Sequence, residues 1–373
     1  MLKVMTIVGT RPEIIRLSRI ITKLDEHCEH TLVHTGQNFD YELNAIFFDE
    51  LNIRKPDVFL HAAGETAIDT IAQVMVSADR VMVDIEPDAL LLLGDTNSAL
   101  AAIPAKRRKI PIFHMEAGNR CFDLRVPEEI NRKIIDHIAD INLPYSEIAR
   151  EYLLREGIPP DQVIKTGSPM HEVLDFYREK ISNSGVLDQM DLRSQDYFLV
   201  SVHREENVDV PENLQKIFSI LNALVETYHL PVIVSMHPRT RKRIESLGIQ
   251  ANHSIIFNKP FGFIDYVKLQ TEAKVVLSDS GTITEESSIL NFPALNLREA
   301  NERPEGFEEG AVMMVGLDTE HVLSAIKILA TQARGSVRDI QLISDYATGN
   351  VSDKIVRIIM SYTDYVNNKI WKK

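Results

Sequence analysis

Residues 274–287 read KVVLSDSGTITEES and predict a buried parallel strand that turns directly into a helix. The β-branched run at residues 275–277 is typical of a strand covered on both faces. The turn contains Ser280 and Gly281, and glycine lets the backbone approach a ligand where the free N–H groups of a helix start attract phosphate. Glu286 follows within two helical turns, where a carboxylate could accept hydrogen bonds from ribose hydroxyls. The stretch alone fits a nucleotide-diphosphate site and an ordinary strand-to-helix turn equally well.

Composition indicates a globular protein of two-domain size. The 373 residues suffice for two α/β cores, and the contents of 44% hydrophobic and 25% charged residues are typical values. The net charge of −13 argues against nucleic-acid binding, because no basic surplus is available to neutralise phosphates. Two cysteines without metal-ligand spacing fit a reduced, cytoplasmic setting. The short apolar start and the lack of any apolar run of membrane-spanning length predict neither a signal peptide nor a membrane segment.

Strand and helix signals alternate in two successive sets, which predicts two doubly wound, Rossmann-like α/β domains. The first set runs from a strand at residues 4–8 to one at residues 163–164, and the second begins with a strand at residues 198–202. The pattern pauses near residue 168, and residues 182–195 are polar enough to form a linker or a surface excursion. We therefore expect one domain over residues 1–168 and a second over residues 169–349.

Polar residues follow the carboxyl ends of the expected strands in both domains. The positions are Gly9-Thr10-Arg11, Asp95, Glu116, His203, His237 and Ser280. Any one of them could cap a helix or close a turn. Open α/β sheets, however, bind ligands outside the carboxyl ends of their strands. Six such positions across two domains therefore favour an active site in a cleft between the domains. No strand is followed by a G-x-G-x-x-G fingerprint and no metal-ligand spacing occurs, so we expect neither a nicotinamide cofactor nor a metal.

Seven short motifs extend this pattern along nearly the whole chain. They are GTRPE at 9–13, LLGDTNS at 92–98, HMEAGNR at 114–120, PEEINR at 127–132, HREEN at 203–207, SDSGTITEE at 278–286 and NERPE at 301–305. In order and spacing they resemble the non-hydrolysing UDP-N-acetylglucosamine 2-epimerases, a stronger signal than a lone glycine-rich loop. The resemblance implies a glycosyltransferase B-type architecture with a C-terminal helix, about residues 350–373, crossing back onto the first domain. It also implies a UDP-sugar substrate, no cofactor, a cytoplasmic location and a homodimer.

The resemblance further implies a role for each candidate site residue. Asp95, Glu116 and Glu128 match the family's catalytic acids, and His203 matches a catalytic histidine near the diphosphate. The positions that match substrate or UDP contacts are Arg11, Arg16, Arg132, His237, Ser280, Gly281, Glu286 and Arg303. Two simpler interpretations stay open, a structural role for His237 and a surface helix pair formed by Glu128 and Arg132.

The implied reaction inverts C2 of a UDP-N-acetylhexosamine. Anti elimination of UDP gives a 2-acetamidoglucal, and UDP adds back after a proton reaches the opposite face of C2. This route needs carboxylates beside the sugar for proton transfer and cationic or donor groups at the leaving diphosphate. The motifs supply both.

Two departures from the family's commonest pattern bear on the substrate. Residues 38–41 are Asn-Phe-Asp-Tyr where many members have His-Arg, which puts an allosteric substrate site in doubt, and Arg16 replaces a lysine. The TGQNFDYEL and HREEN variants look like the branch that converts UDP-2-acetamido-2,6-dideoxy-L-talose to UDP-N-acetyl-L-fucosamine for surface polysaccharide. We expect that reaction, with UDP-N-acetylglucosamine/UDP-N-acetylmannosamine epimerisation as the alternative. A GT-B glycosyltransferase, a hydrolysing epimerase and a non-enzymatic UDP-sugar sensor are the rival classes.

Overall fold

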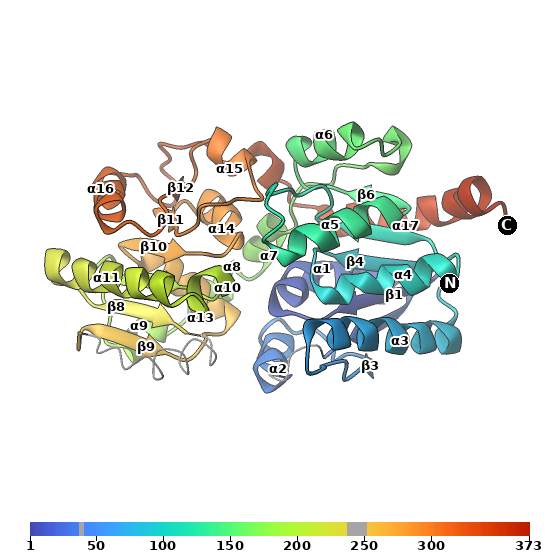
Figure 1. Ribbon diagram of the computed structural model, residues 1–373, viewed down its shortest axis with the longest axis horizontal. Helices are drawn as coiled ribbons and strands as arrows, with labels where there is room; N and C mark the ends of the chain where they lie inside the picture. Colours follow the sequence, from blue (N-terminus) through green and yellow to red (C-terminus); the bar gives the residue numbers. More distant parts are fainter. Residues whose placement is uncertain (37–40, 237–251) are drawn as a thin grey trace. The chain divides into compact units, whose positions relative to one another are not determined.

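The computed structural model describes residues 1–36, 41–236 and 252–373, and the chain divides into two compact units (Figure 1). The first unit comprises Met1–Phe176 and Ser344–Lys373, and the second comprises Tyr177–Ile343. Each unit is built on a six-stranded sheet whose paired strands are parallel. The predicted fold class, α/β with two doubly wound sheets, is confirmed.

The first sheet has the strand order β3-β2-β1-β4-β5-β6. Its strands are β1 (Lys3–Val8), β2 (Glu29–His34), β3 (Val58–Phe59), β4 (Ala89–Leu93), β5 (Ile112–Met115) and β6 (Ile141–Leu143). The helices of this unit are α1 (Arg11–His27), α2 (Tyr41–Glu50), α3 (Ala67–Ile85), η1 (Asn97–Ala101), α4 (Ala102–Arg107), α5 (Pro127–Ile138), α6 (Glu147–Arg155), η2 (Pro160–Gln162), α7 (Met170–Phe176), η3 (Ser344–Tyr346), α17 (Val351–Val366) and η4 (Asn367–Trp371). The strand order reverses between β1 and β4, and ligands bind at such switch points in open α/β sheets.

The second sheet repeats this topology with the order β12-β11-β10-β7-β8-β9. Its strands are β7 (Phe198–Ser201), β8 (Val232–Ser235), β9 (Ile255–Asn258), β10 (Val275–Ser278), β11 (Ala294–Asn296) and β12 (Met313–Met314). Its helices are α8 (Arg178–Ser182), α9 (Val186–Gln189), α10 (Glu205–Val208), α11 (Pro211–Tyr228), α13 (Phe263–Glu272), α14 (Thr282–Leu290), α15 (Glu305–Glu308) and α16 (Thr319–Leu329). Here the switch point lies between β7 and β10, the strands that lead into the HREEN and SDSGTITEE motifs.

Apolar side chains cover both faces of the central strands. All five residues of β4 are buried, which explains why residues 89–93 show a continuous apolar run instead of an alternating one. On one face Leu90 and Leu92 pack with Met5 and Ile7 of β1 against α3 and α4. The second unit has an equivalent layer between β7, β8 and β10 and the helices α11 and α16.

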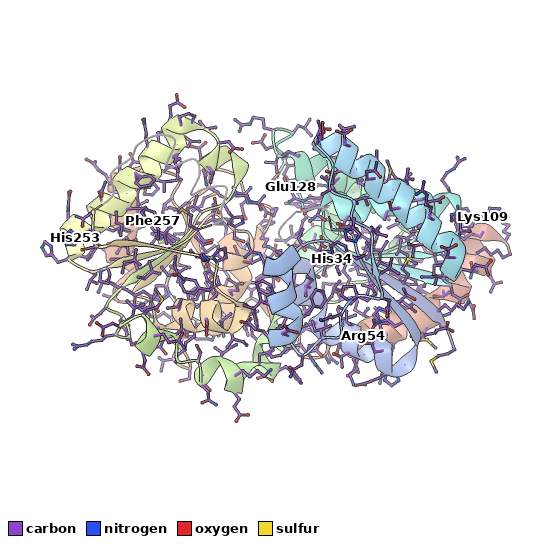
Figure 2. All side chains as sticks on the ribbon, turned by 90° about the horizontal axis from the view of Figure 1, so that it is seen from below. His34, Arg54, Lys109, Glu128, His253 and Phe257 are labelled. Carbon is purple, nitrogen blue, oxygen red and sulfur yellow. The ribbon has the colours of Figure 1, made fainter. Side chains whose placement is uncertain are left out.

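Figure 2 shows Lys109 and His253 each at an outer edge of its own unit, whereas His34 lies buried at the end of β2. Of the helices within the described ranges, none combines the length and the apolar character needed to cross a membrane.

Two details of the first sheet differ from the sequence prediction. The expected strand at residues 163–164 is only an isolated bridge between Val163 and Asn142. The sixth strand is instead β3, which the sequence did not reveal because two residues are too few to show a periodic pattern. The polar stretch at residues 182–195, expected as a linker or a surface excursion, belongs to the second unit and contains the short helix α9.

The boundary between the units also differs from the expected one. Residues 169–176 and 344–349, assigned to the second domain from the sequence, cluster with the first unit. Helix α7 packs on α1, where Arg19 lies 3.5 Å from the centre of the Phe176 ring. Asp345 accepts hydrogen bonds from the Glu147 backbone at 3.1 Å and from Lys165 at 2.9 Å. These contacts hold both segments on the first unit.

Candidate active site

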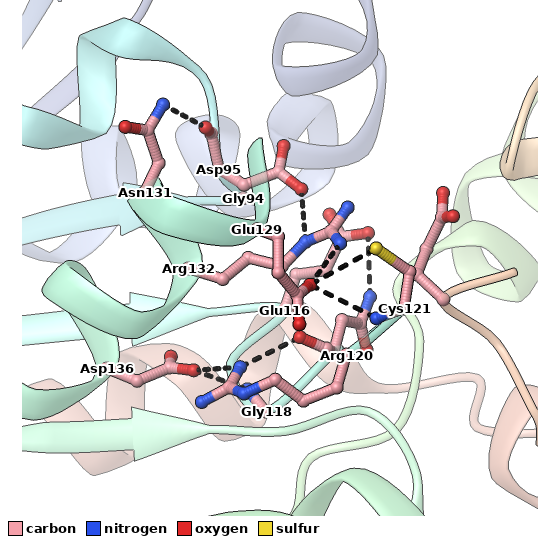
Figure 3. A network of polar contacts seen from close by, with 12 residues as sticks. Gly94, Asp95, Glu116, Gly118, Arg120, Cys121, Glu129, Asn131, Arg132 and Asp136 are labelled. Atoms are coloured by element: carbon pink, nitrogen blue, oxygen red, sulfur yellow. Dashed lines mark hydrogen bonds and ion pairs between the residues drawn. The ribbon is translucent and has the colours of Figure 1, made fainter. Parts of the chain in front are cut away.

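Asp95 follows β4 at the switch point of the first sheet, and two residues of α5 hold it there (Figure 3). Arg132 donates from Nε to the Asp95 carboxylate at 2.7 Å, and Asn131 donates to the Asp95 carbonyl oxygen at 2.9 Å. Arg132 also pairs with Glu129 at 2.9 Å, and both of these side chains are buried. The Asp95 side chain keeps 27% of its surface exposed. Arg132 thus points inward and fixes a carboxylate that solvent or a ligand can reach.

Glu116 follows β5, the neighbouring strand, and has a strained backbone. Its φ of 64° lies in the left-handed region, which non-glycine residues seldom occupy and which costs on the order of 1–3 kcal/mol. The buried Arg16 of α1 donates to its carboxylate at 2.6 Å, and Asn119 donates at 3.3 Å. Strain of this kind persists where surrounding contacts enforce it, and it gathers at functional sites.

Glu128 is the second residue of α5, and its side chain is half-buried (Figure 2). Arg11, at the first position of α1, lies with its guanidinium carbon 5.8 Å from the centre of the Phe47 ring. Of the candidate residues in the first unit, the structure brings four together in two ion pairs. Asp95 pairs with Arg132, and Glu116 pairs with Arg16.

A buried charged layer that the sequence did not predict supports this site. Asp136 accepts hydrogen bonds from His114 Nδ1 at 2.9 Å, from Arg120 at 2.7 Å and from the Gly118 backbone at 3.1 Å. His114 Nε2 lies 2.9 Å from the carbonyl oxygen of Gly94, the residue before Asp95. Both ring nitrogens of His114 therefore face acceptors, which indicates a doubly protonated imidazolium.

The direction of the pKa shifts in this layer agrees with that geometry. Burial alone lowers the pKa of His114, but the hydrogen bond and negative charge of Asp136 outweigh it, so the pKa is raised. Burial raises the pKa of Asp136, but the contacts with His114 and Arg120 lower it by more. The pKa of Asp136 is therefore lowered overall. His114, Asp136 and Arg120 are thus charged together beneath the Asp95 loop.

In the second unit, Asp279 joins the two motifs at the switch point. It is fully buried, and its carboxylate accepts hydrogen bonds from the backbone N–H groups of His203 and Arg204 and from the Asn207 amide. His203 Nδ1 lies 3.2 Å from Asp279, while 42% of the His203 side chain is exposed. Since Ser280 is the next residue, the structure brings the candidate histidine and the Ser280 turn side by side.

The turn before α14 is tightly packed around Gly281. A Cβ at this position would lie 2.3 Å from a carboxylate oxygen of Glu302, so a larger residue would require the Glu302 side chain to move. Glu302 in turn accepts hydrogen bonds from Arg298 at 2.7 Å and Arg204 at 3.2 Å. Ser280 Oγ lies 3.1 Å from the Thr282 hydroxyl at the helix start.

Glu286 lies within α14 and Arg303 pairs with a residue of the same helix, but the two have different partners. Arg303 pairs with Glu285 at 3.3 Å, and both side chains are buried. Glu286 accepts a hydrogen bond from Gln270 at 2.6 Å. The sequence missed Asp279, Glu285 and Glu302 as partners, although all three lie within quoted motifs. His237 and residues 37–40 lie outside the described residues.

Comparisons with known proteins agree with this geometry. A family model described as UDP-N-acetylglucosamine 2-epimerase matches residues 22–360. The structure of a UDP-N-acetylglucosamine 2-epimerase from Rickettsia bellii is similar, with a TM-score of 0.93, 51% identity and full coverage of both chains. A UDP-GlcNAc 2-epimerase from Methanocaldococcus jannaschii, in complex with UDP-GlcNAc and UDP, has a TM-score of 0.90 and 33% identity over 96% of this chain and all of its own.

The chain belongs to the UDP-N-acetylglucosamine 2-epimerase family, and it is a UDP-sugar 2-epimerase, an isomerase. The MurG structure from Acinetobacter baumannii, only 13% identical, has a TM-score of 0.54 over 97% of this chain and all of its own. That likeness concerns the fold alone and identifies it as GT-B-like.

Proposed function

We propose that the chain interconverts UDP-N-acetylglucosamine and UDP-N-acetylmannosamine by inverting C2. The similar structures from Rickettsia bellii and Methanocaldococcus jannaschii carry this enzyme's name, and the latter holds UDP-GlcNAc and UDP. The TGQNFDYEL and HREEN motifs favoured the L-talose substrate, and residues 37–40 of the first motif lie outside the described residues. The relatives reported above support the alternative reaction instead.

The observation that carries the mechanism is the pair of carboxylates after β4 and β5, each held by a buried arginine. Inversion at C2 needs one group that removes a proton and another that delivers one to the opposite face. We assign these two steps to Asp95, Glu116 and Glu128 as a set. Arg132 and Arg16 pair with Asp95 and Glu116 at 2.7 and 2.6 Å and fix the directions of these two carboxylates.

The proposed route is balanced in electrons and protons. A carboxylate takes the C2 proton, the C2–H electron pair forms the C1=C2 bond, and the C1–O bond breaks with its electrons leaving on UDP. The second stage protonates C2 on the other face, and a diphosphate oxygen of UDP forms the bond to C1. No external oxidant or reductant takes part.

We place the leaving diphosphate at the start of α14, with Ser280, Gly281 and Arg303, and with His203 beside it. Free N–H groups and the dipole of a helix start favour an anion. Glu286 is our candidate for the ribose hydroxyls. We predict that Ser280→Ala and Arg303→Lys each weaken UDP binding about tenfold or more, since a charged or hydroxyl hydrogen bond is worth about 1–3 kcal/mol.

Calorimetric titration with UDP tests this assignment, with Arg193→Ala as a control because Arg193 is exposed in the same unit. Arg303→Lys keeps a positive charge opposite the buried Glu285, so the fold is retained while the planar guanidinium is lost. Wild-type affinity in both variants would move the diphosphate site elsewhere.

The substrate is tested by separate incubations with UDP-N-acetylglucosamine and UDP-2-acetamido-2,6-dideoxy-L-talose, followed by NMR. We expect UDP-N-acetylmannosamine to form from the first compound until equilibrium is reached. Turnover of the L-talo compound alone would replace our substrate with the one that the sequence variants favoured. Release of free N-acetylmannosamine would indicate the hydrolysing class.

We also propose that the chain forms a homodimer through helices α3, α4 and α5, which lie side by side on the first unit (Figure 1). Exposed aliphatic side chains gather there, Ile68, Val76 and Val83 on α3, Ile103 on α4, and Ile130 and Ile134 on α5. Several exposed aliphatic side chains on neighbouring helices support an interaction surface. We predict that Val76→Glu yields a monomer by light scattering, whereas Ile328→Glu, at an exposed site on α16, leaves the dimer intact. A wild-type monomer would refute the proposal.

A further inference from the structure

Glu13, the third residue of α1, is a buried carboxyl group beside the candidate site, and the family motif gave it no role. One of its oxygens accepts hydrogen bonds from the backbone N–H groups of Gly9 and Thr10, the latter at 3.0 Å. Its other oxygen accepts a hydrogen bond from the Thr96 hydroxyl at 2.6 Å. The first bonds cap α1, as in other capping boxes. The second reaches a different loop, 83 residues further along the chain, and capping does not require it.

Thr96 is the residue after Asp95, so this bond acts on the Asp95 loop. The Thr96 oxygen also accepts a hydrogen bond from the Ser98 backbone at 3.3 Å and caps η1. On its other side Asp95 is held through its carbonyl oxygen and carboxylate by Asn131 and Arg132. The loop of Asp95 and Thr96 is thus held from α5, through Asp95, and from α1, through the Thr96 hydroxyl.

The turn at Gly9, on the α1 side of this arrangement, is closely packed. Ser98 Oγ and Thr35 Oγ1 are 2.7 Å apart, and a Cβ at Gly9 would lie 2.0 Å from the first and 2.3 Å from the second. The loops after β1, β2 and β4 therefore meet without room for a side chain. A shift of the Gly9 turn would be transmitted to Thr96 through Glu13.

Helix α1 also supplies Arg16, the partner of Glu116. Its first two turns thereby reach both loops that carry the candidate proton-transfer groups, Glu13 toward Asp95 and Arg16 toward Glu116. Burial raises the pKa of Glu13 to about 7, the three hydrogen bonds oppose the shift, and the charge of Asp95 adds to it. The carboxyl group of Glu13 therefore interacts with the charge of Asp95 and also accepts a hydrogen bond from Thr96, the residue after Asp95.

We propose that Glu13 is a positioning residue that acts through the Thr96 hydroxyl to hold the Asp95 carboxylate toward the reacting sugar. This inference rests on the proposed role of Asp95 in the epimerase reaction. Neither Glu13 nor Thr96 needs to touch the substrate for it to hold. Because a misplacement of about 1 Å at a reacting group can cost about a hundredfold in rate, loss of the bond should lower kcat substantially.

The test compares three substitutions at one position. Thr96→Val and Thr96→Ala remove the hydroxyl, whereas Thr96→Ser keeps it. We expect kcat to fall about tenfold to a hundredfold in the first two and to stay near wild type in the third, with UDP affinity unchanged in all. If the additional methyl group of valine disturbs the fold, Thr96→Ala still removes the hydroxyl without adding bulk. Kinetics are measured on whichever UDP-sugar the wild type epimerises. A wrong substrate assignment is then detected with the wild type, before any variant is compared.

Thr66 provides a matched control, because its hydroxyl donates to Asp69 at 2.6 Å at the exposed start of α3. Thr66→Val removes an equivalent threonine–carboxylate bond, and we expect a lower melting temperature with unchanged kcat. Equal kcat in Thr96→Ala and Thr96→Ser would overturn the proposal. So would a Thr96→Ala variant whose kcat falls no more than that of Thr66→Val.

Discussion

Asp95→Asn, Glu116→Gln and Glu128→Gln should each lower the rate of epimerisation by about 10²–10⁴-fold, the usual effect of removing a positioned acid or base. Each substitution removes a charge with little change in shape. The proposed UDP site lies in the second unit, so UDP affinity should stay at the wild-type value. Steady-state rates and calorimetric UDP titration measure the two effects separately.

Reaction in D₂O adds a direct test of the proton transfer at C2. Elimination takes a proton from one face of the sugar and returns one to the other, so the product should carry deuterium at C2 because the abstracted proton can exchange before return. Glu151→Gln, an exposed carboxylate on α6, is the matched control and should keep the wild-type rate and label. Full retention of the C2 proton would favour transient oxidation with internal hydride return. Wild-type rates in all three variants would show that the catalytic assignment is wrong.

The sequence predicted the strand-end positions of this site because strands carry a local signal. A buried parallel strand such as residues 89–93 is visible as an apolar run, and the polar residue after it must then lie at the edge of the sheet where ligands bind. That reasoning placed Asp95, Glu116, His203 and Ser280 after their strands, where the structure has them.

The supporting contacts could not be predicted in this way, because they join residues far apart in the sequence. Asp136 contacts Arg120 and His114 from a helix position that looks like any acidic residue of an amphipathic helix. Asp279 and Glu13 lie within recognised motifs, but a motif does not say which backbone groups a carboxylate accepts from. Burial of an acidic residue is a tertiary property, and single-sequence periodicity does not report it.

Asp136→Asn should destabilise the first unit by about 3–5 kcal/mol, since it removes one partner of a buried ion pair and leaves Arg120 and His114 insufficiently compensated. The matched control is Asp79→Asn. Asp79 makes two short bonds to Arg108, at 2.6 and 2.7 Å, but on the surface. Surface ion pairs contribute about 0–1 kcal/mol, so the control should unfold close to wild type in urea. Equal midpoints for the two variants would contradict the charged layer described here.

The pH dependence of this difference follows from the two pKa shifts. The raised pKa of His114 contributes stability below its ordinary value of 6.5, and this is lost as pH rises through the folded-state pKa. The lowered pKa of Asp136 contributes stability above its ordinary value of 3.8, lost as pH falls through the folded-state pKa. The gap between wild type and Asp136→Asn should therefore be largest between these two values and shrink as His114 loses its proton. Urea unfolding from about pH 4 to alkaline pH measures the gap, and a gap that stays constant as pH rises above 6.5 would mean that His114 is neutral in the folded protein.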